Sequence, residues 1–138
     1  MNIEERYLKT IIGKFKEVKQ LGDKTIEQLT DSELYWSMNE ASNSIAVIMK
    51  HLSGNMISRW SDFLTSDGEK ESRDRDSEFT DDVESRKEML ENWEAGWQTL
   101  LSTLSTLESE DLLKTIRIRS EEHIVIEAIE RQVSHYYY

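Results

Sequence analysis

The sequence predicts an all-α protein, built as a four-helix bundle with long connections between its helices. Apolar residues recur at three- and four-residue intervals in four long segments, which is the periodicity of amphipathic helices. The 138 residues include no proline and only five glycines, so the commonest helix breakers are scarce. Charged residues make up 33% of the chain, which suits solvated helix faces. The length fits one domain over residues 1–138.

The first long helix is predicted from about Asn2 to Leu21, and Gly22 is expected to close it. A short helical turn follows. Thr30 and Glu33 have the spacing of a capping box, in which each side chain bonds the backbone N–H of the other residue.

The second long helix is expected to start near Ser42 or Asn43, because both residue types cap helix N-termini well. Its apolar face continues to Phe63. Residues 65–82 are rich in charge and lack apolar periodicity, so they predict a long surface connection. The acidic residues within it do not follow the spacing of a calcium-binding loop, and a solvated loop is the expectation for them.

The third long helix is predicted to be capped by Thr80 or Asp81, with Glu84 completing a capping box. Its apolar positions alternate in threes and fours up to Leu104.

An alternating stretch at residues 114–120 then predicts extended chain, the only place where it is expected. Ser120 is predicted to cap the last helix, with Glu121 and Glu122 at its positive end. The residues at the centres of the four apolar faces should be buried: Phe15, Leu52, Met56, Trp93, Trp97, Leu100, Ile129 and Val133.

Composition excludes several classes of function. The net charge of −11 argues against nucleic acid and against an anionic membrane surface as partners. No segment approaches the ~20 apolar residues of a membrane span. The acidic N-terminus lacks the apolar core of an export signal, so a cytoplasmic location is expected. The chain contains no cysteine, which removes disulfides and thiolate ligands.

Two of the three histidines could carry chemistry. A helical projection puts His51 beside Asn55 at the edge of an apolar face, and His135 beside Gln132 at a similar edge. Side chains at such edges can point into a polar cavity of a bundle. The commoner situation is a half-buried histidine that bonds a neighbouring helix, and the pattern leaves both interpretations open.

The third histidine, His123, is expected in the first turn of the last helix. Twelve residues separate it from His135, or ~18 Å along a continuous helix, which is too far for one metal ion. His123 is therefore expected to pack at a helix end or against a loop.

The end of the sequence continues an amphipathic helix without a stop signal. A second metal ligand often lies four residues after the first on a helix. The position four after His135 would be the first one beyond Tyr138, so the last helix is expected to be truncated here. The expected exposure of Tyr136, Tyr137 and Tyr138 predicts a homodimer.

Three segments together resemble the DinB-like (YfiT-like) superfamily, in a bacterial branch of unknown function: NSIAVIMKHLSGNMISRWSDFL, DGEKESRDRDSEF and IRIRSEEHIVIEAIERQVSHYYY. The resemblance runs over essentially the whole chain. KHLSGN on the second long helix and RQVSHYYY on the last form its most specific combination.

The resemblance implies a bundle that holds a divalent metal, nickel or zinc, with a histidine triad. By position, His51 matches the first ligand and His135 the second, while the third would lie beyond Tyr138. Asn55 and Gln132 are then expected to bond the ligands. The superfamily's better understood members transfer or hydrolyse thiol adducts, which implies a metal-dependent protein that acts on a thiol or a small electrophile. The alternative is a non-catalytic binding or dimerisation module with a vestigial metal site.

Overall fold

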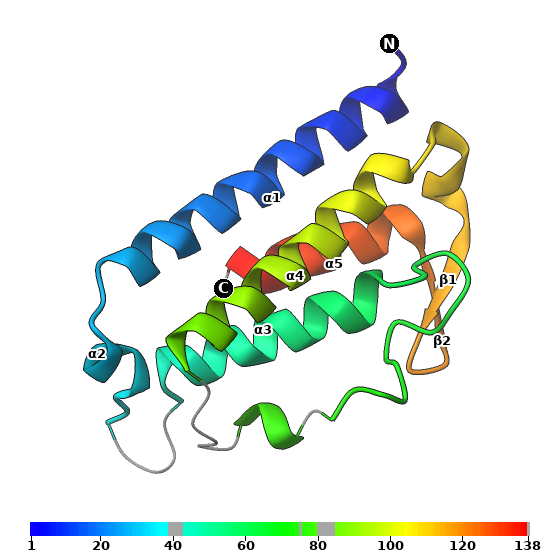
Figure 1. Cartoon of the computed structure of the whole chain (residues 1–138). Helices are drawn as coiled ribbons and strands as arrows, with labels where there is room; N and C mark the ends of the chain where they lie inside the picture. Colours follow the sequence, from blue (N-terminus) through cyan, green and yellow to red (C-terminus); the bar gives the residue numbers. More distant parts are fainter. Residues whose placement is uncertain (39–42, 75, 80–84, 138) are drawn as a thin grey trace.

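The structure is a computed structural model, and it describes residues 1–38, 43–74, 76–79 and 85–137. The described chain is mostly helical and has one small antiparallel sheet (Figure 1). This agrees with the predicted all-α class. None of the described helices combines the length and the apolar character that a membrane crossing requires. The elements in chain order are α1 (Ile3–Glu27), α2 (Asp31–Tyr35), α3 (Ile45–Trp60), η1 (Asp76–Phe79), α4 (Arg86–Thr106), η2 (Ser109–Leu113), β1 (Thr115–Ile118), β2 (Glu121–Ile124) and α5 (Val125–Tyr137).

Helix α1 is longer than predicted. It does not stop at Gly22 but continues to Glu27. A Cβ atom on Gly22 would lie 2.7 Å from Cζ2 of Trp93 on α4. Gly22 therefore allows a close approach of α1 to the Trp93 ring, and the expectation that it closes the helix is wrong.

Three helix N-termini are capped by hydroxyl side chains. The predicted capping box of Thr30 and Glu33 is present in α2. In α3 the cap is Ser44, whose hydroxyl accepts from the N–H of Val47 at 3.1 Å, so Asn43 is not the cap and the predicted Ser42 lies outside the described residues. In α4 the cap is Ser85.

The predicted caps of the third long helix, Thr80 and Asp81, lie outside the described residues together with Glu84. Helix α4 starts at Arg86, and the hydroxyl of Ser85 accepts from the N–H of Glu88 at 3.1 Å. This side-chain bond satisfies one of the first N–H groups of the helix.

The extended stretch is confirmed as strand β1, but it continues into a hairpin. Strands β1 and β2 pair in antiparallel fashion, from Thr115 opposite Ile124 to Ile118 opposite Glu121. Arg119 and Ser120 form the turn with φ values of 52° and 67°, as two-residue hairpin turns require.

Ser120 is consequently not a helix cap, and α5 begins only at Val125. The physical reason is the carboxylate of Asp67, which accepts the N–H groups of Arg119 and Ser120 at 2.8 Å each. These bonds hold two non-glycine residues in the left-handed region, which they rarely adopt without such support.

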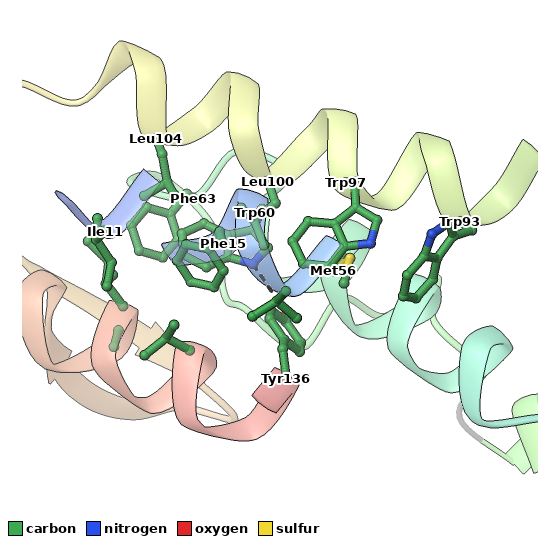
Figure 2. Close-up of a cluster of buried hydrophobic side chains, with 14 of the residues drawn as sticks. Ile11, Phe15, Met56, Trp60, Phe63, Trp93, Trp97, Leu100, Leu104 and Tyr136 are labelled. Atoms are coloured by element: carbon green, nitrogen blue, oxygen red, sulfur yellow. Dashed lines mark hydrogen bonds between the residues drawn. The ribbon is translucent and has the colours of Figure 1, made fainter. Parts of the chain in front are cut away.

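One hydrophobic core joins α1, α3, α4 and α5 (Figure 2). Phe15 of α1 lies edge-on to Trp60 of α3, with ring centroids 5.9 Å apart. Trp97 of α4 lies 6.2 Å from Tyr136 of α5 in the same way. Seven of the eight predicted core residues are buried, and Leu52 is only partly buried.

Tyr136 is also buried, because its hydroxyl donates to Oδ1 of Asn55 at 2.5 Å and accepts from Nε1 of Trp60 at 3.3 Å. The expected exposure of this tyrosine is therefore wrong. Tyr137 is exposed, and Tyr138 lies outside the described residues. These bonds tie the end of α5 to the middle of α3, which fixes the two helices that carry His51 and His135.

Candidate functional site

The fold brings His51 of α3 and His135 of α5 together. Their ring centroids are 5.9 Å apart and their planes are nearly perpendicular, at 84°. Both rings line one cavity of about 530 Å³ that also contains Asn55 and Gln132. The predicted juxtaposition of the two histidines is therefore found, while their role as metal ligands stays a prediction.

The orientation of His51 is set by Glu78 of η1. Oε1 of Glu78 lies 3.0 Å from Nδ1 of His51, and Glu78 is only 5% exposed. Nη2 of Arg73 lies 3.5 Å from the same nitrogen, but it donates to Oε1 of Glu78 at 2.8 Å. We therefore assign the Nδ1 proton of the neutral ring to the bond with Glu78. That leaves the lone pair on Nε2, as in histidines that bind metals with a carboxylate behind them.

Arg73 holds the Glu78 carboxylate from the other side. Its Nε donates to Oε2 at 2.9 Å and its Nη2 to Oε1 at 2.8 Å, a two-pronged pair. Both side chains are almost completely buried, at 4% and 7% exposure. Helix α3 leaves room for the pair at Gly54, where a Cβ atom would collide with the Glu78 carboxylate.

The surroundings of His135 favour the neutral form of its ring. Partial burial lowers its pKa below the ordinary value, and the nearby imidazole of His51 and guanidinium groups of Arg59, Arg131 and Arg73 lower it further. Neutral imidazole is the form that binds metal ions. The residue as a whole is nevertheless exposed to solvent.

The two amides sit in the cavity wall. Asn55 is fixed by its bond from Tyr136. The Oε1 atom of Gln132 is buried and has no hydrogen-bond partner among the described residues. Whether either amide supports a bound metal through the histidines stays a prediction. Glu78 is the support that the geometry defines, and sequence reasoning missed it because it lies in the charged connection expected to be a solvated loop.

His123 does not belong to this cavity. It lies in strand β2 opposite Ile116, and not in the first turn of a helix as predicted. Its nearest acidic neighbour is Glu121, with Nε2 and Oε2 4.0 Å apart. Nε2 of His123 is buried and lacks a hydrogen-bond partner within the described part of the chain.

The residues present fit a metal ion only in part. The cavity offers two imidazoles, one of them oriented by a carboxylate. Catalytic zinc sites use three protein ligands. Among residues 1–38, 43–74, 76–79 and 85–137, no group of three or more His, Asp or Glu side chains is placed to hold a metal.

The fold and site thus define a mostly helical protein with a histidine pair in a polar cavity between two helices. The chain belongs to DUF1572, a family described as proteins of unknown function, whose model matches residues 2–138. No curated protein and no solved structure matches it.

Proposed function

We propose that this protein is a DinB-like four-helix bundle that binds a divalent metal, nickel or zinc, through His51 and His135. The observation that carries the proposal is the convergence of these two rings, 5.9 Å apart, with Glu78 fixing the first. The shared core of α1, α3, α4 and α5 supports the bundle architecture.

The segments that resemble the DinB-like superfamily support the same site. KHLSGN lies on α3 and contains His51, and RQVSHYY lies on α5 and contains His135. The resemblance assigns the third ligand to a histidine four residues beyond His135. The proposal itself rests on His51 and His135.

A metal in this position would supply a Lewis acid that activates a thiol or a water molecule toward a small electrophile. The protein's own contribution is positional. Glu78 and Arg73 fix the ring of His51, and the lowered pKa of His135 favours its neutral form. The roughly 530 Å³ cavity leaves space for a small substrate beside the histidines.

Metal titration of chelator-stripped protein tests the proposal. We expect Ni²⁺ or Zn²⁺ to bind at one site per chain, and His51→Ala and His135→Ala each to abolish the binding. His123→Ala is the matched control, because it removes a histidine that does not line the cavity. Binding that survives both His51→Ala and His135→Ala would contradict the proposal.

A second arm addresses the third ligand. One histidine appended after Tyr138 places an imidazole one helical turn beyond His135. An added ligand of this kind should tighten metal binding by about tenfold or more. No gain in affinity would show that the helix does not aim this position at the pair.

A non-catalytic binding module is the second candidate function. It is favoured by the lack of a third ligand among the described residues and by the arginines that line the same cavity. This candidate predicts ligand binding with no turnover of thiol adducts, whether or not metal is added.

A further inference from the structure

The cavity beside the histidines is strongly basic in a protein whose net charge is −11. Its wall contains no Asp or Glu among the described residues. The cationic residues of the wall come from α3, the loop after it, the hairpin turn and α5: Arg59, Arg73, Arg119 and Arg131.

Among the described residues, two carboxylates pair with these guanidinium groups. Glu69 is shared, since its Oε2 lies 2.8 Å from Nη1 of Arg59 and 3.6 Å from both Nη1 of Arg73 and Nε of Arg119. Glu78 pairs with Arg73, as described above. Arg131 has no carboxylate within 4.0 Å in the described part of the chain. Within the described part of the chain, the four guanidinium groups of the wall therefore exceed their paired carboxylates by about two charges.

Several buried polar atoms of the same wall lack hydrogen bonds within the described residues. They are Nε of Arg59, Nη1 of Arg73 and Oε1 of Gln132. Arg59 is 6% exposed and Gln132 is 4% exposed. Leaving buried donors and acceptors unpaired is costly, and each of these three atoms belongs to a side chain that lines the cavity.

We propose that this cavity binds a small molecule with two negative charges, whose oxyanion groups, carboxylate or phosphate, lie on the arginines. Guanidinium groups suit such oxyanions because they can donate two parallel hydrogen bonds.

The inference rests on the proposed function in one respect: it names the class of substrate that the histidine pair would act on. A ligand held by the arginines would place its remaining atoms beside His51 and His135, because all of these side chains line one cavity. The binding itself depends on the arginines and not on a metal.

Calorimetric titration of protein that has been stripped of metal and dialysed free of chelator tests the inference with two oxyanion compounds. Glycerol 3-phosphate supplies a phosphate group and succinate supplies two carboxylates, while glycerol and succinamide are their uncharged counterparts. We expect at least one of the two dianions to bind with a Kd below about 1 mM and both neutral compounds not to bind. The better dianion identifies the oxyanion, and its affinity should fall as salt is added.

Matched variants locate the site. Arg131→Gln and Arg119→Gln each remove an exposed cation of the cavity wall, so the fold should survive. Each should weaken dianion binding by about tenfold. Arg117→Gln removes an exposed arginine of the same hairpin that does not line the cavity, and it should leave the affinity unchanged.

The inference is overturned if neither dianion binds at 10 mM, taken as about ten times the expected Kd. It is equally overturned if the neutral compounds bind as well, or if Arg117→Gln weakens binding as much as Arg131→Gln. Because the dianion titration uses metal-free protein, a failed metal titration with intact dianion binding overturns only the metal proposal. The opposite result overturns only this inference.

Discussion

Oε1 of Glu78 lies 3.0 Å from Nδ1 of His51, and the same carboxylate accepts two hydrogen bonds from the guanidinium group of Arg73. This relationship joins a residue of the charged connection to one of the helical core. It turns a histidine at the edge of an apolar face into one with a defined tautomer and orientation. It also places the buried ion pair of Glu78 and Arg73 directly behind the candidate site.

Replacing Glu78 with Gln should destabilise the protein and free the His51 ring. Arg73 would keep its buried charge without its closest carboxylate, and breaking a buried pair in this way costs about 3–5 kcal/mol. Urea unfolding measures the loss of stability, and ¹⁵N chemical shifts of the imidazole report whether His51 still carries its proton on Nδ1. Glu71→Gln, at an exposed position of the same connection, should change neither quantity. Because the amide oxygen of Gln can still accept the Nδ1 proton, Glu78→Ala removes the acceptor altogether, and an unaltered His51 tautomer in that variant would contradict the assigned role of this carboxylate.

The two glycines Gly54 and Gly13 should respond to alanine with opposite signs. Both lie inside helices, where Ala is favoured over Gly by about 1 kcal/mol. At Gly13 nothing lies within 4 Å of an added Cβ, so Gly13→Ala should stabilise the protein by about that amount. At Gly54 the added Cβ collides with the Glu78 carboxylate, so Gly54→Ala should destabilise it by about 1–3 kcal/mol. Urea unfolding of the two variants checks the signs, and a stabilised Gly54→Ala would mean that Glu78 is not held in place.

Removal of one buried hydroxyl should loosen the connection between α3 and α5. In Tyr136→Phe the buried acceptor of Asn55 and the buried N–H of Trp60 each lose a partner. We expect a loss of about 1–3 kcal/mol in the free energy of unfolding. The control is Tyr137→Phe, because Tyr137 is 52% exposed and its variant should be nearly neutral. Equal effects of the two substitutions, measured by thermal or urea unfolding, would contradict this arrangement of α5.

Stability should depend on pH through Asp67. Backbone N–H groups of Glu69, Ser120 and Arg119 bond its carboxylate and lower its pKa below the ordinary value. Because the folded pKa is lower than the unfolded one, ionised Asp67 contributes stability above its unfolded pKa of about 3.9. The contribution disappears as the pH falls from there through the folded pKa.

Asp67→Asn should therefore be less stable than the unaltered protein by about 1 kcal/mol at neutral pH. The difference should shrink as the pH falls below about 4. Urea unfolding across this pH range measures it. A difference that stays constant with pH would show that the carboxylate charge does not support the hairpin turn.

Local patterns in the sequence were enough to predict most of the helical structure. Apolar periodicity located the four long helices, and the capping box at Thr30 was confirmed. The errors lie where contacts distant in sequence decide. Gly22 looks like a helix end, but it lies inside α1, where the absence of a Cβ atom lets the Trp93 ring pack closely against the helix. Ser120 looks like a helix cap, but Asp67 draws it into a hairpin turn from 53 residues away.

Only part of the candidate site could be predicted from local patterns in the sequence. His51 and His135 stand at the edges of apolar faces, so periodicity and the family resemblance both pointed to them. Glu78 and the four arginines come from loops and separate elements with no common motif. Only the folded chain brings the four arginines to one cavity and places Glu78 behind His51.

A metal site at the two converging rings is tested most directly by a Zn²⁺ titration of the protein, followed through the imidazole signals of its three histidines by NMR. The signals of His51 and His135 should shift together with one common affinity, while those of His123 should not move. Signals of His51 and His135 that stay unchanged, or that respond no more than those of His123, would contradict the claim that the two converging rings form a metal site.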